Sequence, residues 1–230
     1  MRKLILIVLL LICWHGCEND SSDKSLISSE QIESINEATT SVDTSSDVLN
    51  TWSDGDIIFQ TSLSSQSEAI QRATKSKYSH IGIVLEEEGE WYVYEAVQPV
   101  KMTRLLEWIN RGNDNHYVLK RLRQYPGGLN QAQIHSLRVS ADQFRGKNYD
   151  LHFGWGNESI YCSELVWKMY DEGLGIQLCE LRELNEFDLS DPIVKKKMSE
   201  RYGNQIPMNE QVVSPEDIYQ SDLLIEITIR

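Results

Sequence analysis

The stretch SIYCSELVWKMYDEGLG, residues 159–175, decides how this sequence folds. Its apolar positions recur at i, i+3, i+4 and i+7, the pattern of one buried helix face: Cys162, Leu165, Val166 and Met169. Ser159 is a typical N-cap residue, and Gly173 or Gly175 is a typical helix stop. The segment is therefore predicted to be a buried helix with a cysteine in its first turn.

A cysteine on that buried face has two interpretations. Free cysteine is among the most buried residue types, so Cys162 taken alone is a core residue. With Ser159 as the cap, however, Cys162 lies beside unpaired N–H groups at the positive end of the helix dipole. That position stabilises a thiolate and supplies N–H groups that can receive an oxyanion. It favours a nucleophile, provided that a base lies nearby.

A predicted β-hairpin supplies the base. Two strand-like runs, HIGIVL from His80 and WYVYEA around Glu95, flank an EEEGE turn. With residues 86–89 as the loop, Ile83 lies opposite Tyr92 and His80 lies directly opposite Glu95. Directly opposed residues share a face, with Cβ atoms about 5 Å apart. An imidazole and a carboxylate so placed form the base and orienting acid of a Cys–His–acid triad, unless the loop changes by one residue.

Helices and short strands alternate along the rest of the chain without a regular βαβ rhythm. This order favours an α+β fold. Further strands are predicted at 56–60, at 116–123 and in the final LLIEITI run. Further helices are predicted from their N-cap residues: Ser65, Thr103 (to Gly112), Asn130 (to Gly146), Asp191 and Ser214.

The sequence does not predict a metal or an organic cofactor. It has no HExxH motif, no paired CxxC motifs, no phosphate loop and no GxSxG elbow. The acidic DGD at 54–56 is interpreted as a turn before a strand. His116, His135 and His152 are interpreted as structural or surface residues, although His152 could line a cleft.

The N-terminus has the pattern of an export signal. A basic pair precedes the apolar run LILIVLLLI at 4–12, which suits a signal-peptide core. Cys17 follows a glycine and resembles the cysteine of a bacterial lipoprotein cleavage site. Residues 1–17 are predicted to be a lipoprotein signal, with an uncleaved anchor or an ordinary secretion signal as alternatives. We expect an exported protein of the bacterial cell envelope, attached to the membrane by lipid on Cys17.

Residues 18–51 are rich in serine, threonine and acidic side chains and contain no aromatic residue. Such a segment buries too little apolar surface to fold, so it is predicted to be a flexible tether. The folded domain is then 52–230. The formal net charge of −13 argues against nucleic acid as a partner. Within the domain, Cys162 and Cys179 could pair in an oxidising compartment, which is the structural alternative to a free nucleophile.

Several motifs in order along residues 53–220 resemble the YiiX-like proteins: GDIIFQ, YSHIGIV, YEA, GKNYDLHFGW, YCSELVWKMY and SPEDIY. These proteins form a circularly permuted, NlpC-type branch of the papain-fold cysteine hydrolases. The resemblance implies a small antiparallel sheet or partial barrel packed on a central helix that carries the cysteine.

The resemblance also implies roles for single residues. Cys162 is the nucleophile, His80 the base and Glu95 the third polar residue of the triad. Tyr161 and the N–H groups at the helix start are oxyanion candidates. Four further aromatic residues of the matched motifs are candidates for lining the cleft: Tyr78, Tyr149, Phe153 and Trp155.

The implied reaction is acyl transfer to water through a thioester, with no cofactor. The expected substrate is an amide, for example in the stem peptides of peptidoglycan. A lipid esterase or acyltransferase on the same triad is an alternative, and so is a catalytically silent binding lipoprotein.

Overall fold

The computed structural model describes residues 51–228. The predicted signal at 1–17, including Cys17, lies outside the described residues, and so does the predicted tether apart from Thr51. The described residues all belong to one compact structural unit. Within 51–228, no helix combines the length and the apolar character needed to cross a membrane.

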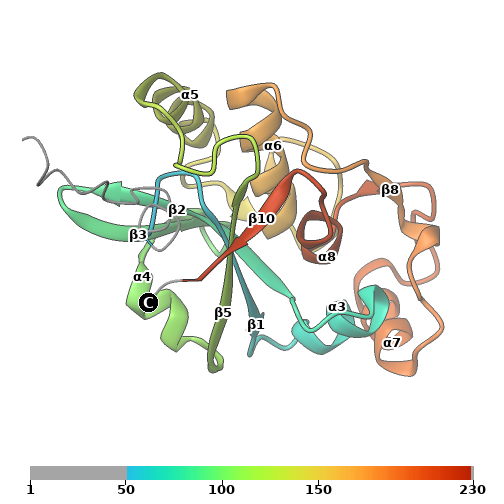
Figure 1. Ribbon diagram of the computed structural model, residues 1–230. Helices are drawn as coiled ribbons and strands as arrows, with labels where there is room; N and C mark the ends of the chain where they lie inside the picture. Colours follow the sequence, from blue (N-terminus) through green and yellow to red (C-terminus); the bar gives the residue numbers. More distant parts are fainter. Residues whose placement is uncertain (1–50, 229–230) are drawn as a thin grey trace, which may run out of the picture. The chain divides into compact units, whose positions relative to one another are not determined.

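Six antiparallel strands form the main sheet, in the order β10-β5-β1-β2-β3-β4 (Figure 1). Their bounds are β1 (Ile57–Ser62), β2 (His80–Glu87), β3 (Glu90–Glu95), β4 (Lys101–Arg104), β5 (Gly112–Leu122) and β10 (Leu224–Ile227). Two pairs of two-residue strands lie outside it: β6 (Asn148–Tyr149) with β7 (Ser159–Ile160), and β8 (Arg182–Glu183) with β9 (Gln211–Val212). The predicted strands are confirmed, and β5 begins earlier than expected.

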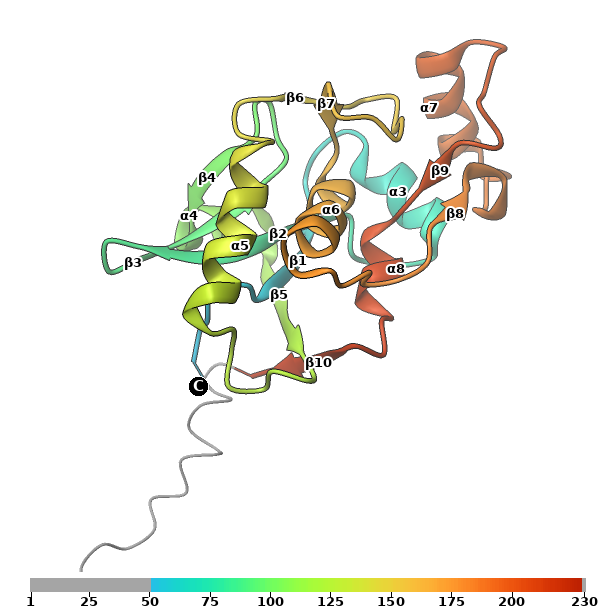
Figure 2. The same cartoon turned by 90° about the horizontal axis from the view of Figure 1, so that it is seen from above.

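Six α-helices and one 3₁₀ helix complete the described chain: α3 (Ser67–Thr74), α4 (Leu105–Asn110), α5 (Gln131–Asp142), α6 (Cys162–Leu174), η1 (Leu184–Glu186), α7 (Pro192–Tyr202) and α8 (Pro215–Tyr219). Helices α5 and α6 cover one face of the sheet, and α4 covers the other (Figure 1). Helix α3 packs against α7 beside the pair β8–β9 (Figure 2).

Alternation along the strands builds the two sides of the core, because successive side chains of a strand point to opposite faces. On β2, Ile81, Ile83 and Leu85 pack in the cluster with α6, whereas Val84 packs with Val93 in the cluster with α4. Helix α6 packs on β2 through the apolar stripe read from the sequence. The predicted α+β fold, a small antiparallel sheet on a central helix that carries the cysteine, is confirmed.

Three predicted N-caps are confirmed, because their side chains accept hydrogen bonds from the first turn of the helix: Asn130, Asp191 and Ser214. The predicted stop of α6 at Gly175 is also confirmed, since Gly175 has φ 67° and follows the last helical residue. Helix α5 ends at Asp142, one turn before the predicted stop at Gly146.

Three other predicted caps are wrong. Helix α3 begins at Ser67 with Gln66 at the N-cap, so Ser65 lies outside it. Thr103 lies in β4 and donates its hydroxyl to Glu95. Ser159 lies in β7, paired with β6. Thr103 and Ser159 each interact with a segment distant in sequence, and therefore neither caps a helix.

A buried ion pair ties β5 to the start of β1. Arg121 Nε donates to Asp56 Oδ1 at 2.6 Å, and Arg121 Nη2 donates to Asp56 Oδ2 at 2.8 Å. Burial raises the pKa of Asp56, and the hydrogen bonds and charge of Arg121 oppose that rise. The backbone N–H of Ser53 also donates to Asp56 Oδ2. The interpretation of 54–56 as a turn is confirmed, with Gly55 at φ 85°.

Removing one partner of this pair is predicted to destabilise the domain strongly. Asp56→Ala leaves the guanidinium buried without its carboxylate, so the free energy of unfolding should fall by about 3–5 kcal/mol. The control is Glu68→Ala, which breaks the exposed pair with Arg72 and should cost only a few tenths of a kcal/mol. Urea denaturation followed by circular dichroism measures both; equal effects of the two changes would contradict the prediction.

Candidate active site

The loop between β2 and β3 is two residues shorter than predicted. Glu88 and Gly89 alone form it, with φ of 54° and 82°, the backbone that a two-residue hairpin needs. Ile83 therefore lies opposite Tyr94, and the predicted pairing with Tyr92 is wrong. A shift of two residues changes the partners but keeps every side chain on its face.

His80 and Glu95 consequently still meet, but as diagonal neighbours and not as a directly opposed pair. His80 Nε2 lies 2.6 Å from Glu95 Oε2. Gly82, the next residue after His80 on the same face of β2, lies beside Glu95. A Cβ added to Gly82 would lie 2.4 Å from Val93 Cγ1 and 3.5 Å from Glu95 Cβ. The missing side chain thus allows the close strand approach that brings the carboxylate to the imidazole.

Glu95 is fully buried and accepts hydrogen bonds from three more side chains. Thr103 Oγ1 donates to Oε1 at 2.5 Å, and Trp108 Nε1 donates to Oε2 at 2.9 Å. Arg111 Nη2 lies 2.7 Å from both oxygens. Burial alone would raise the pKa of Glu95, but the hydrogen bond and charge of His80, the charge of Arg111 and the Thr103 hydrogen bond hold it at about 2. The carboxylate is therefore ionised and fixed.

Sequence reasoning missed Thr103, Trp108 and Arg111. It placed all three in a single helix, whereas Thr103 belongs to β4, Trp108 to α4 and Arg111 to the residue after α4. Their convergence on one carboxylate depends on the pairing of β3 with β4 and on the packing of α4 against β3. Neither the strand pairing nor the helix packing can be predicted from the local sequence pattern.

His80 interacts with Glu95 and with Cys162. Its ring stacks on Trp108, with ring centroids 5.7 Å apart and planes inclined by 25°. Burial lowers the pKa of His80, but interactions with the Cys162 thiol and with Glu95 outweigh burial and raise it to about 9. Because Nε2 is bonded to Glu95, Nδ1 is the ring nitrogen left for the thiol. The imidazolium form is favoured at neutral pH.

Cys162 is the first residue of α6, closer to the positive helix end than predicted. Its side chain is buried, on the face of α6 that packs on the sheet. Glu164 Oε2 accepts the backbone N–H of Tyr161, the N-cap residue, at 3.3 Å. Lys168 Nζ in turn lies 2.7 Å from Glu164 Oε1 and donates to the carbonyl of Gly156. The buried ion pair between Glu164 and Lys168 fixes the start of α6, where Cys162 lies.

Tyr149 reaches the same thiol from β6. Burial raises the pKa of its hydroxyl well above the ordinary value, and the charge of Cys162 raises it further. Gln66 Nε2 donates to the Tyr149 hydroxyl oxygen at 2.9 Å, and Arg201 Nη2 donates to Gln66 Oε1 at 2.6 Å. With its oxygen accepting from Gln66, Tyr149 can direct its own proton toward the sulfur or toward an oxyanion formed beside it.

The other predicted cleft residues have different surroundings. The Tyr161 hydroxyl accepts the backbone N–H of Val213 at 3.1 Å, so it is engaged inside the fold. Tyr78 packs against Tyr219 with tilted rings, and Trp155 packs edge-on against another tryptophan. Tyr78 and Trp155 line neither of the two pockets at the site.

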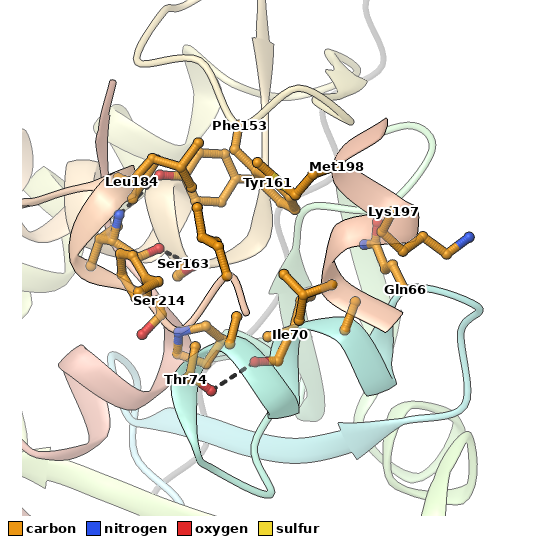
Figure 3. Close-up of a pocket in the computed structure, with 18 of the residues that line it drawn as sticks. Gln66, Ile70, Thr74, Phe153, Tyr161, Ser163, Leu184, Lys197, Met198 and Ser214 are labelled. Atoms are coloured by element: carbon orange, nitrogen blue, oxygen red, sulfur yellow. Dashed lines mark hydrogen bonds between the residues drawn. The ribbon is translucent and has the colours of Figure 1, made fainter. Parts of the chain in front are cut away.

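Two pockets meet at the catalytic candidates. The apolar pocket (Figure 3) includes Cys162, Tyr161 and Phe153 among its walls. The second pocket has more polar side chains in its walls than the first and includes His80 and Tyr149. Gln66 lines both pockets. The thiol and the imidazole therefore face two different environments.

The alternative of a Cys162–Cys179 disulfide is contradicted, because both are free thiols. Burial raises the pKa of the Cys179 thiol to about 12. His152 packs against Tyr202 and lines neither pocket. Among residues 51–228, no three His, Cys, Asp or Glu side chains are arranged to hold a metal ion.

Comparisons with known proteins agree on one family. The model for the permuted papain-like amidase enzymes of the YaeF/YiiX, C92 family matches residues 51–228. The uncharacterized protein YiiX of Escherichia coli strain K12 is 46% identical over 173 residues, which cover 75% of this chain and 84% of that protein.

A solved structure has the same fold. The crystal structure of the metalloprotein yiiX from Escherichia coli O157:H7 superimposes with a TM-score of 0.74 at 46% identity and covers 77% of this chain and 97% of that chain. The description as a metalloprotein concerns that protein. In the part of this chain that the structure describes, the available side chains do not fit a resident metal site.

The charge state of His80 can be tested without a substrate. In the folded protein His80 should titrate near pH 9, and Glu95→Gln should lower that pKa because it removes a negative charge at 2.6 Å. The control Glu90→Gln changes an exposed carboxylate on the same strand, paired with Arg104, and should leave the His80 titration unchanged. Imidazole resonances followed by NMR across pH 5–10 report the titration. A wild-type His80 that titrates below 6.5 would contradict the account.

Proposed function

The chain belongs to the permuted papain-like amidases of the YaeF/YiiX, C92 family, and from this we propose that it is a cysteine hydrolase in which Cys162, His80 and Glu95 cleave an amide. One observation carries the proposal: a buried imidazole, bonded to a buried carboxylate, interacts with a thiol at the first residue of a helix. A thiol can act as the nucleophile, an imidazole as the base and a carboxylate as the group that orients the imidazole.

In the first half of the reaction the Cys162 thiolate attacks the carbonyl carbon of the substrate. The carbonyl electron pair moves to the oxygen, where helix-start N–H groups and the Tyr149 hydroxyl stabilise the oxyanion. As the tetrahedral intermediate collapses, the C–N bond breaks and His80 donates its proton to the leaving amine. The product is a thioester on Cys162 and a neutral imidazole.

In the second half, His80 removes a proton from water and the resulting hydroxide attacks the thioester carbon. A second tetrahedral intermediate expels the Cys162 thiolate and releases the carboxylic acid, and His80 is again protonated. Glu95 holds the ring in one orientation and stabilises the imidazolium in both halves. Thr103, Trp108 and Arg111 act only through Glu95 and are positioning residues.

The proposed substrate contains an amide, and a cell-wall peptide amide follows from the family resemblance and the proposed export to the cell envelope. Hydrolysis or transfer of a lipid acyl group by the same three residues is the second candidate, favoured by the apolar walls beside Cys162. We also propose that the protein is a lipoprotein attached through Cys17, with no nucleic-acid partner. A silent binding protein would keep the fold without turnover.

Loss of the nucleophile distinguishes an enzyme from a silent relative. Cys162→Ala and His80→Ala should each lower the hydrolysis rate by about 10³-fold or more, since removal of one triad member disables the unit. Cys179→Ala, the other free thiol of the domain, should keep the wild-type rate. The assay follows acyl p-nitroanilides by absorbance and digested peptidoglycan by mass spectrometry. Wild-type rates in the Cys162→Ala variant would refute the assignment.

Thiol reactivity separates the two cysteines chemically. At pH 6, iodoacetamide should modify Cys162 much faster than Cys179, because Cys162 lies beside the His80 imidazolium at the start of a helix, whereas burial raises the pKa of the Cys179 thiol to about 12. His80→Ala should slow the modification of Cys162 only. Peptide mapping measures the two rates; equal rates in the wild type would argue against an activated thiol.

A further inference from the structure

The second pocket at the site, the one that includes His80, has a volume of about 700 Å³, within the range of small-molecule sites. Its walls come from β1, β2, β6 and the segments that precede α3 and follow β3. Of the described wall residues, only Arg111 and His80 can carry a positive charge, and none is an aspartate or a glutamate. In a chain with a formal net charge of −13, this wall therefore favours an anion over a cation.

Two amide side chains of these walls are occupied by the fold. Gln66 donates to the Tyr149 hydroxyl oxygen and accepts from Arg201. Gln98 Nε2 donates to Asn148 Oδ1 at 2.6 Å, and Gln98 Oε1 accepts the backbone N–H of Tyr149 at 2.7 Å. A ligand would have to compete with these bonds, so recognition falls on other groups of the wall.

Arg111 differs from these amides because Glu95 engages only one of its nitrogens. Arg111 Nη2 lies 2.7 Å from both oxygens of Glu95. Among residues 51–228, no hydrogen bond forms from Arg111 Nε or Nη1, and the side chain is 40% exposed. Guanidinium N–H groups bind carboxylates through charge-assisted hydrogen bonds. Arg111 thus offers the pocket a site for one carboxylate.

The spacing between Arg111 and His80 limits where that carboxylate lies on the substrate. Glu95 Oε2 lies 2.6 Å from His80 Nε2 and 2.7 Å from Arg111 Nη2, so the imidazole and the guanidinium are neighbours. In the proposed reaction His80 protonates the leaving nitrogen. A carboxylate that reaches Arg111 is therefore separated from that nitrogen by only a short chain, as in an α-amino acid.

We propose that the second pocket is the leaving-group subsite and that it takes an amine with an α-carboxylate, which Arg111 binds. Such an amine is a free amino acid or the C-terminal residue of a peptide. This inference rests on the proposed function, because it takes His80 as the proton donor to the leaving amine. In the reaction Arg111 acts only through Glu95, whereas in binding it contacts the leaving group and determines specificity.

Binding to an inactive variant tests the subsite apart from catalysis. In Cys162→Ala, N-octanoylglycine should bind about tenfold more tightly than N-octanoylglycinamide, because only the carboxylate gains a charge-assisted hydrogen bond. N-Octanoyl-ethylenediamine, whose leaving group is cationic, should bind more weakly than either. The three compounds share one acyl group, so a difference in affinity arises from the leaving group. Isothermal titration calorimetry gives the affinities.

Arg111→Gln, added to Cys162→Ala, should bring the glycine and glycinamide derivatives to equal affinity. The altered support of Glu95 affects both compounds alike, so the ratio of affinities reports the carboxylate contact. Arg111→Lys keeps the charge and should keep part of the preference. The matched control Arg104→Gln removes an exposed arginine that pairs with Glu90 outside the pocket and should keep the full preference. Thermal melts check folding.

Ser65→Asp serves where Arg111→Gln fails to fold. It adds a carboxylate at an exposed position of the pocket wall and should lower the preference for the glycine derivative. Equal affinities of the glycine and glycinamide derivatives in Cys162→Ala would overturn the inference. So would a preference that survives unchanged in a folded Arg111→Gln variant or, where that variant does not fold, in Ser65→Asp.

Hydrolysis of the glycine and glycinamide derivatives by the wild-type protein is measured in parallel. A preference in binding with no hydrolysis of either compound would refute the hydrolase and leave the carboxylate site standing. Hydrolysis of both compounds at equal kcat/KM would refute the subsite and leave the hydrolase standing.

Discussion

The hydrogen bond between His80 and Glu95 is the interaction on which the rest of the site depends. A fully buried carboxylate is costly unless it is paired, and four side chains share this one. They come from β2, β4, α4 and the residue after α4, so the contact is made only when the β2–β3–β4 meander and its covering helix are in place. The orientation of the imidazole therefore depends on the folding of this half of the domain.

Helix α6 brings the thiol to this preformed pair from the opposite face of the sheet. Its apolar stripe packs on β2, and the Glu164–Lys168 pair fixes its first turn, so Cys162 meets His80 at the strand end. Burial raises the pKa of Glu164 to about 7, against the opposing hydrogen bond and charge of Lys168. The site thus joins two parts of the domain, one that holds the base and one that holds the nucleophile.

Much of this could be predicted from sequence where the cause is local. Asn130, Asp191 and Ser214 were identifiable as caps because each bonds within its own helix turn. Ser159 and Thr103 have the same capping chemistry, but a parallel strand pair and a buried carboxylate engage them instead. The hairpin register was wrong by two residues, yet the face of Glu95 was right because strand side chains alternate with period two. The convergence of side chains on Glu95 and the walls of the apolar pocket depend on tertiary packing, which no local pattern encodes.

The central claim is that Cys162 carries the acyl group during turnover. The most direct measurement is mass spectrometry of protein quenched within its first turnovers of p-nitrophenyl octanoate, an activated ester that makes breakdown of the thioester the slow step, followed by peptide mapping. The account predicts an octanoyl group on the peptide that contains Cys162, formed and lost at rates that match product release. Turnover with no acyl group on Cys162, or with the group on another residue, would contradict it.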